Sequence, residues 1–333
     1  MRIFINGFGR IGRSVLRAFL QSPERWPGLE VVGVNDIAAP DMCAYLFEFD
    51  SIFGPWRGTV ALDGSDLVVD GHHIPLHSVR DISTLDLRGV DLVMECTGRA
   101  DGREMAARGL RAGAARVLVS GPSKAADYTI VLGANEAGLC PREHKILSNA
   151  SCTTNALAPL VALIEAEWGV VTGSMTTIHC YTGSQPTVDA PAADFARSRA
   201  AAVSMVPTTT SAQRLLDEVL PALAGRIEGS AVRVPVVSVS AVDLAVMTAR
   251  PTTVEGVNAV FRAAAQTAGG VIGATDRALV STDMRARRES IVMACPETRI
   301  TAGVMLRVFG WYDNEWGFSN RMLDVASLLK AKS

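Results

Sequence analysis

RIFINGFGRIG, residues 2–12, decides the fold of the first half of this chain. The apolar run RIFIN is followed at once by Gly7, Gly9 and Gly12, and a helical pattern extends from Ile11 to Leu20. In such a strand, turn and helix unit the first glycine permits a tight turn and the second lets the backbone approach a pyrophosphate. The third lets the helix pack closely on the strand. The N–H groups at the helix start carry partial positive charge that attracts phosphate. The stretch therefore predicts a dinucleotide site on an α/β fold.

An acidic residue stands where such a site needs one. The next apolar run, LEVVGVND, ends in Asp36, which follows Gly12 by 24 residues. A carboxylate about 20 residues beyond the glycines accepts hydrogen bonds from the adenosine ribose and repels a 2′-phosphate. We therefore expect NAD rather than NADP. The alternative interpretation is that no ligand binds here, so that the glycines only form a tight turn and Asp36 is a solvated acid in a loop. Neither feature identifies a substrate.

Short apolar runs recur up to about residue 149, separated by helical patterns or turns. Runs that are apolar throughout and rich in β-branched residues indicate parallel strands covered on both faces. The first half is therefore expected to be a doubly wound, Rossmann-type α/β sheet. The runs are RIFIN, LEVVGVND, VDLVMECTG, ARVLVS, TIVLG and HKILSN.

The pattern changes after Cys152. Long, more alternating strands are expected in GVVTGSMTTIHCYT, AVRVPVVSVSAVDLAVMTA and AGVMLRVFGWYD. Runs of strands with few helical crossovers predict an α+β domain on a mostly antiparallel sheet. The polar segment from Gly183 to Thr210 is too long for a plain connection, which makes it a candidate functional loop. Helices are expected at Thr153–Trp168, Ala212–Val219, Val254–Ala268 and Trp316–Lys330.

Composition narrows the classes of function. A chain of 333 residues suggests about two domains, and 48% hydrophobic residues suffice for globular cores. A net charge of −2 gives no field that would hold nucleic acid or an anionic membrane. We find no apolar stretch of about 18 residues and no signal-peptide pattern, so we expect a soluble, cytoplasmic protein. The six cysteines lack metal or disulfide spacing, so we expect no metal site, although one reactive thiol is possible.

The octapeptide SNASCTTN, residues 148–155, contains a candidate nucleophile. Its serine and asparagine residues favour a helix start, which would put Cys152 in the first turn. There the backbone N–H groups and a nearby imidazole would lower the pKa of the thiol and stabilise a thiolate. His179, near the end of a predicted strand, could then act as general base. Read singly, Cys152 could be an inert buried residue and His179 a core histidine.

Taken together, these segments resemble the phosphorylating glyceraldehyde-3-phosphate dehydrogenase family, and the likeness extends over nearly the whole chain. SNASCTTN and WYDNEWG are the most specific motifs, and both are shared with the related erythrose-4-phosphate dehydrogenases. The other matching segments are INGFGRIGR, VNDI, ECTG, SGPSK, MTTIHCYT with Gln185, RAAAVSMVPTTTS and AVRVP.

The resemblance implies a mechanism and a role in glycolysis. Cys152 would attack the aldehyde of glyceraldehyde 3-phosphate to give a thiohemiacetal, while His179 takes the proton. Hydride transfer to NAD would leave an acyl thioester, which inorganic phosphate would cleave to an acyl phosphate. The likeness also implies an NAD-binding domain of residues 1–150 with 315–333, a catalytic domain of residues 151–314, and a homotetramer in which the long loop reaches a neighbouring subunit.

Further site residues follow only from that likeness. The substrate phosphate would be held by Thr182, Ser184 and Arg233, and the attacking phosphate by Ser151, Thr153, Thr210 and Ser211. Ile37 and Pro191 match NAD-type members at positions that are small and polar in NADP-using relatives. The expected cofactor residues are Gly7, Phe8, Gly9, Arg10, Ile11, Gly12, Asp36, Ile37, Arg80, Thr97, Ser120 and Asn314.

Several positions depart from the usual family pattern. Ser184 replaces a common Thr, Ser211 a common Gly, Phe318 a usual Tyr and Cys180 a usual Ala. The segment 194–199, Cys96 and Phe318 are closer to the erythrose-4-phosphate enzymes, so that substrate is an open alternative. Asp36 and the hydroxyls of 207–210 favour the triose. A third interpretation is a paralogue without catalytic activity. The presence of all the reactive groups argues against it.

Overall fold

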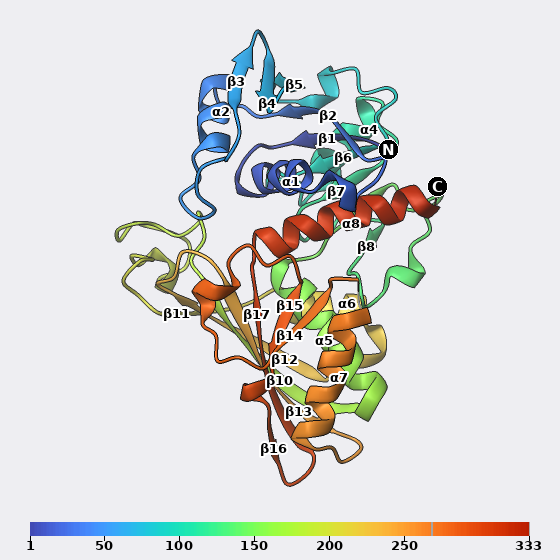
Figure 1. The fold of residues 1–333 in the computed structure, drawn as a ribbon, viewed down its shortest axis with the longest axis vertical. Helices are drawn as coiled ribbons and strands as arrows, with labels where there is room; N and C mark the ends of the chain where they lie inside the picture. Colours follow the sequence, from blue (N-terminus) through green and yellow to red (C-terminus); the bar gives the residue numbers. More distant parts are fainter. Residues whose placement is uncertain (268, 333) are drawn as a thin grey trace. The chain divides into compact units, whose positions relative to one another are not determined.

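The computed structural model describes residues 1–267 and 269–332. The chain divides into two compact units. The first comprises Met1–Ile130, Ala137–Ala150 and the C-terminal residues from Ser319 on, and the second comprises Val131–Glu136 and Ser151–Phe318. Figure 1 labels helices and strands of both units. In the part of the chain that the structure describes, no helix combines the length and apolar character needed to cross a membrane.

The first unit is built on a sheet with the strand order β3-β4-β5-β2-β1-β6-β7-β9-β8. From β5 to β8 every neighbouring pair is parallel, whereas β3, β4 and β5 form antiparallel hairpins at one edge. All residues of β6, β7 and β9 are buried, as is usual for parallel strands covered on both faces. The prediction of a Rossmann-type sheet is confirmed. The bounds are β1 Arg2–Asn6, β2 Glu30–Asn35, β3 Val60–Asp63, β4 Asp66–Val69, β5 His72–His77, β6 Leu92–Glu95, β7 Val117–Val119, β8 Tyr128–Thr129 and β9 Ile146–Ser148.

Helix α1 (Arg10–Gln21) follows the glycine-rich turn and buries Val15, Leu16 and Ala18. It also buries Arg17, whose guanidinium donates to the backbone carbonyls of Phe47 and Gly54. A buried cation is stable only where such acceptors surround it, so Arg17 fixes the segment after α2 against α1. The other helices of this unit are α2 Pro40–Glu48, α3 Arg103–Ala106 and α4 Arg108–Arg111, with 3-10 turns η1 Pro23–Arg25, η2 Ile82–Thr84 and η3 Glu136–Gly138.

Helix α8 (Trp316–Lys332) returns the end of the chain to the first unit. The indole of Trp26 donates to Asp324 at 2.6 Å, and Lys330 donates to the carbonyl of Pro27 at 2.7 Å. These bonds join residues about 300 positions apart in sequence, so the C-terminal helix is an integral part of this unit.

The second unit is built on a sheet with the strand order β11-β12-β10-β13-β17-β15-β14, and β16 pairs with β17. Only the pairs β10–β12 and β14–β15 are parallel, which confirms a mostly antiparallel sheet. The bounds are β10 Val170–Cys180, β11 Val206–Thr208, β12 Ile227–Val234, β13 Ser240–Thr248, β14 Ile272–Thr275, β15 Ile291–Ala294, β16 Arg299–Thr301 and β17 Met305–Tyr312.

One predicted strand of this unit is wrong. AVRVPVVSVSAVDLAVMTA forms two strands, because β12 ends at Val234 and β13 begins at Ser240. Pro235 follows Val234 and has no N–H for a ladder bond, and Val239 turns the chain with a φ of +70°. The two strands then lie on opposite sides of β10, with β12 parallel and β13 antiparallel to it.

The helices of the second unit agree closely with expectation. They are α5 Cys152–Trp168, α6 Ala212–Val219 and α7 Val254–Thr267, with 3-10 turns η4 Ala196–Ser198, η5 Pro221–Leu223, η6 Ser281–Met284 and η7 Cys295–Glu297. The predicted end of α7 at Ala268 lies outside the described residues. The long loop from Gly183 to Thr210 contains only η4 and β11, and Arg199 pairs with Asp189 across it at 2.8 Å.

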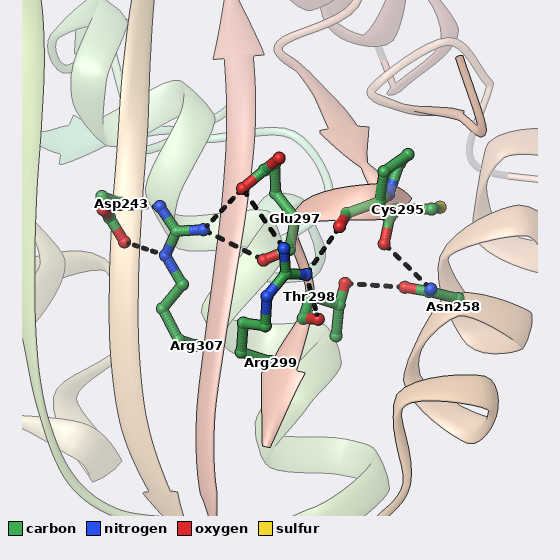
Figure 2. A network of polar contacts seen from close by, with 8 residues as sticks. Asp243, Asn258, Cys295, Glu297, Thr298, Arg299 and Arg307 are labelled. Atoms are coloured by element: carbon green, nitrogen blue, oxygen red, sulfur yellow. Dashed lines mark hydrogen bonds and ion pairs between the residues drawn. The ribbon is translucent and has the colours of Figure 1, made fainter. Parts of the chain in front are cut away.

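A polar network joins strands and helix at one end of this sheet. Figure 2 shows Arg307 of β17 between Asp243 of β13 and Glu297 of η7, with N–O distances of 2.7 and 3.2 Å. Beside it, Thr298 donates to the amide oxygen of Asn258 in α7 at 2.7 Å, and both residues are buried. The network ties α7 to the sheet.

Candidate active site

The glycine-rich turn lies between β1 and α1 in the first unit. Gly7 has a φ of +94°, and a Cβ on it would come within 2.6 Å of the backbone nitrogen of Thr97. A Cβ on Gly12 would lie 2.0 Å from the carbonyl oxygen of Gly7, so the chain excludes side chains at both positions. A Cβ on Gly9 would meet no atom within 4 Å. The backbone at Gly9 therefore faces open space, as a close approach by a pyrophosphate requires.

A cleft of about 260 Å³ lies beside this turn, where β1, β2 and β6 end. Ligands of parallel α/β sheets bind at this edge. Six of the predicted cofactor residues line it, namely Gly7, Gly9, Asp36, Ile37, Arg80 and Thr97. Sequence reasoning missed Asn6, Asn35 and Glu95, which also line the cleft and are the last residues of β1, β2 and β6. A polar residue at the end of each neighbouring strand is the signal that could have found them.

Asp36 is held in place by backbone donors. Its two carboxylate oxygens accept hydrogen bonds from the N–H groups of Phe8 at 2.7 Å and Ala38 at 2.9 Å. Each oxygen has a further lone pair, so the carboxylate can still accept from ribose hydroxyls. The fixed position of Asp36 beside the glycine turn fits the ribose of a dinucleotide.

The remaining predicted cofactor residues of the first unit do not line the cleft. The Phe8 ring is buried and stacks on Phe47, and the side chain of Arg10 forms an ion pair with Asp50. Ile11 and Gly12 follow in α1, so these residues can offer a pyrophosphate the backbone of the first helical turn. Ser120 follows β7 and donates its backbone N–H to the carbonyl of Glu95 at 2.9 Å.

In the second unit, Cys152 is the first residue of α5. Ser151 caps this helix, since its hydroxyl accepts a hydrogen bond from the Thr154 N–H at 3.0 Å. Ala150, just before the cap, has a φ of +53°. The cap and this left-handed residue turn the chain sharply into the helix and place the thiol at its N-terminal end, as predicted from SNASCTTN.

His179 lies near the end of β10 and is 5% exposed. Its Nε2 is 3.5 Å from the Cys152 sulfur, and its Nδ1 is 2.7 Å from the carbonyl oxygen of Cys180. When Nδ1 donates its proton to that carbonyl, the lone pair of Nε2 faces the thiol. The structure thus brings the two predicted catalytic residues within proton-transfer distance.

Arg233 approaches the same imidazole from β12. His179 and Arg233 are partners in the parallel pair β10–β12, and Nη1 of Arg233 lies 2.6 Å from Nδ1 and 3.0 Å from the Cys180 carbonyl. A guanidinium only donates, so Nδ1 can either accept from Arg233 or donate to the carbonyl, one at a time. Among the described residues Arg233 has no carboxylate partner, which leaves its charge available to an anion.

The pKa shifts of the pair differ from the sequence-based expectation. Burial raises the pKa of the Cys152 thiol, and the smaller effects of the Arg233 cation, the Thr153 hydroxyl and nearby backbone N–H groups act against this increase. Burial, followed by the Arg233 cation, lowers the pKa of His179 to about 4. Burial therefore opposes the lowering of the thiol pKa that the helix start predicts, and no local sequence pattern reports burial.

Tyr312, which sequence reasoning missed, connects the elements of this site. Its hydroxyl is buried and bonds to the Thr153 hydroxyl of α5 at 2.9 Å and to the Thr177 hydroxyl of β10 at 2.8 Å. Its ring meets that of His179 edge-on, with 6.0 Å between centroids. Burial raises the pKa of Tyr312 above its usual range. Its place in WYDNEWG was the available signal.

Asn314 follows β17 and lies against the residue next to His179. Its side-chain oxygen accepts a hydrogen bond from the Cys180 thiol at 3.1 Å. Cys180 itself is fully buried. Asn314 is therefore the one predicted cofactor residue that belongs to the second unit.

The predicted phosphate ligands all belong to the second unit. Thr182 and Ser184 follow β10, and their hydroxyl oxygens are 3.0 Å apart. The Thr210 hydroxyl accepts from the Ala212 N–H at 3.1 Å, and Ser211 is exposed at the start of α6. The hydroxyl of Thr153 is buried and bonded to Tyr312.

Comparison with known proteins agrees with this geometry. The family model described as the NAD binding domain of glyceraldehyde 3-phosphate dehydrogenase matches residues 1–103, and the model of its C-terminal domain matches residues 151–314. Proteins named glyceraldehyde-3-phosphate dehydrogenase are similar over nearly their whole length. The protein from Cereibacter sphaeroides is 46% identical over 98% of this chain and 97% of the relative. The protein from Xanthobacter flavus is 45% identical over 98% and 97%, and that from Geobacillus stearothermophilus is 43% identical over 100% and 99%. The chain therefore belongs to the glyceraldehyde-3-phosphate dehydrogenase family, whose N-terminal domain binds NAD.

Proposed function

We propose that this protein oxidises glyceraldehyde 3-phosphate to 1,3-bisphosphoglycerate, with NAD as hydride acceptor and inorganic phosphate as co-substrate. The observation that carries the proposal is the thiol of Cys152, 3.5 Å from Nε2 of His179 at the start of α5. A nucleophile beside a base, with the base oriented through its second nitrogen, is the arrangement that covalent catalysis needs.

In the first step the Cys152 sulfur attacks the aldehyde carbon. His179 accepts the thiol proton as the carbon–sulfur bond forms, since its Nε2 is 3.5 Å from the sulfur. The imidazolium then donates to the aldehyde oxygen and gives a thiohemiacetal. During oxidation His179 takes up the hydroxyl proton of the thiohemiacetal and later releases it to solvent. An oxygen of hydrogen phosphate then attacks the thioester carbon, the carbon–sulfur bond breaks, and the proton of the phosphate restores the thiol.

NAD supplies the acceptor for the hydride that leaves the thiohemiacetal carbon. The chain would hold its adenosine through Asp36 and its pyrophosphate through the turn at Gly9, where no side chain fills the space. Asn314 would hold the carboxamide of the nicotinamide, and its contact with Cys180 keeps it beside the reacting pair. We assign the NAD-binding role to residues 1–150 with 315–333 and the catalytic role to residues 151–314.

Two phosphate sites complete the proposal. Arg233, Thr182 and Ser184 would bind the substrate phosphate, since a guanidinium without a carboxylate partner and two adjacent hydroxyls offer donors to an anion. Ser151, Thr153, Thr210 and Ser211 would bind the attacking phosphate near the start of α5. Several moderate bonds suit a group that must bind, react and leave.

We also propose a cytoplasmic homotetramer. Large apolar side chains are exposed on the loop between Gly183 and Thr210, among them Phe195 at 96% and Val203 at 80%. Exposed apolar side chains on a long loop favour contact with another subunit. Size-exclusion chromatography with light scattering should give four times the 35.3 kDa mass of the chain.

The activity is tested by NADH absorbance with glyceraldehyde 3-phosphate, NAD and inorganic phosphate. We expect turnover that requires phosphate and is weaker with erythrose 4-phosphate, because the relatives bear the triose name. Faster turnover with the tetrose, or turnover independent of phosphate, would contradict the proposal. Absence of any NADH formation would identify a silent member of the family.

A further inference from the structure

A chain of buried polar side chains crosses the floor of the NAD cleft. Asn6 lies at its centre, and its side-chain oxygen accepts a hydrogen bond from the amide nitrogen of Asn35 at 2.9 Å. The amide nitrogen of Asn6 in turn donates to Glu95 at 2.5 Å. The other carboxylate oxygen of Glu95 accepts from the backbone N–H of Thr97 at 3.0 Å and from the Thr97 hydroxyl. Asn6, Asn35 and Glu95 are 6%, 3% and 4% exposed.

The opposite end of this chain is held by backbone. The N–H of Val79 donates to the side-chain oxygen of Asn35 at 2.9 Å, and the amide nitrogen of Asn35 donates to the carbonyl of Val79 at 3.1 Å. We call the side chains of Asn6, Asn35 and Glu95 the polar strap. It extends from Val79 on one wall of the cleft to Thr97 on another, across the ends of β2, β1 and β6.

The polar strap has a direction. The backbone of Val79 fixes which end of the Asn35 amide carries the oxygen, and Asn35 then presents a donor to Asn6. Asn6 must accept from Asn35 and so presents its own donor to Glu95. The next residue in this series of hydrogen bonds must accept from both Asn6 and Thr97. A carboxylate meets this requirement, because both of its oxygens accept hydrogen bonds.

We propose that Asn6, Asn35 and Glu95 are positioning residues that set the width of the NAD cleft by locking three strand ends together. If two donors or two acceptors in the polar strap faced each other, the strand ends would separate or an amide would rotate into the cleft. Either change moves the walls that carry Thr97 and Val79, so part of the binding energy of NAD would be used to restore them. The inference rests on the proposed use of this cleft for NAD.

The direction of the polar strap allows a rescue experiment. Glu95→Gln sets a donor against a donor, since in either amide orientation its nitrogen faces Asn6 or the Thr97 N–H. Asn6→Asp sets two carboxylates against each other. In the double variant, the new carboxylate at position 6 accepts from Asn35 and from the new amide nitrogen at position 95. The amide oxygen at position 95 then accepts from Thr97. The double variant therefore restores every bond with the net charge unchanged.

The test is isothermal titration of each full-length variant with NAD alone. We expect each single variant to bind about tenfold more weakly or worse, and the double variant to return to within about threefold of wild type. The sign for Glu95→Gln is informative, because removing a negative charge from the lining of the cleft would by electrostatics alone tighten the binding of an anionic dinucleotide. Losses that add in the double variant, or single variants that fold and bind like wild type, would overturn the proposal.

Two further variants separate positioning from general stability. Asn35→Ala removes the link between Val79 and Asn6 without opposing like groups, and we expect NAD binding to be about threefold weaker or worse. Unchanged binding overturns the proposal even if the other single variants do not fold. Thr298→Val removes a matched buried bond to Asn258 in the second unit, and it should lower stability without changing NAD affinity. NAD binding by wild type tests the proposed cofactor use separately from these ratios.

Discussion

Replacing Tyr312 with Phe tests how the site is tied together. The Thr177 hydroxyl has one proton and gives it to the carbonyl of Ala241 at 3.0 Å, so Tyr312 must donate to Thr177. The Tyr312 oxygen then accepts from the Thr153 hydroxyl. Tyr312→Phe removes two buried hydrogen bonds and leaves the Thr153 hydroxyl without this acceptor.

The structure sets the size of both effects. At about 1 kcal/mol for each bond, the free energy of unfolding should fall by about 2 kcal/mol, which lowers the melting temperature by roughly 4–8 °C. Thr153 already acts to lower the pKa of the Cys152 thiol, and its released hydroxyl can then donate to that sulfur more fully. One added hydrogen bond to the thiolate should lower the pKa of Cys152 by about one unit.

Calorimetric melting measures the first effect, and the pH dependence of the rate of alkylation by iodoacetamide measures the second. Thr153→Val combined with Tyr312→Phe is the control, since it removes the released donor and should abolish the decrease in the thiol pKa. An unchanged melting temperature, or a thiol pKa that rises in Tyr312→Phe, would refute this account of the hydrogen bonds.

Three further outcomes are expected. Cys152→Ser should abolish NADH formation and leave NAD binding largely intact, and undiminished turnover would remove this thiol from the mechanism. Gly12→Ala should prevent folding of the first unit, because its Cβ would meet the Gly7 carbonyl at 2.0 Å, whereas Gly9→Ala should fold and weaken NAD binding in a titration. The pKa of His179 is about 4, below its usual 6.5, so the unfolded chain takes up this proton first as the pH falls. The contribution of His179 should therefore lower the free energy of unfolding of wild type by about 3 kcal/mol between pH 6.5 and 4. In urea unfolding, His179→Asn should lack this contribution.

Local chemistry made much of the fold predictable. The strand ending at Asn6, the turn at Gly7 and the start of α1 each follow from neighbouring residues, so a short window contains the whole signal. The same holds for the cap at Ser151 and the helix that places Cys152. Pro235 shows the limit, because an apolar run on both sides of it concealed the break between β12 and β13.

The sequence by itself determined the kinds of groups present: a glycine turn with an acidic partner, a thiol at a helix start, and motifs that identify the family. Tertiary structure alone decided how those groups behave. Burial raises the pKa of Cys152 and lowers that of His179, and the register of β10 with β12 brings Arg233 to the imidazole. Long-range packing also joins Asn6, Asn35 and Glu95 into one directed chain. The reason is physical, since desolvation and hydrogen-bond direction depend on atoms that are distant in sequence and meet only in the folded chain.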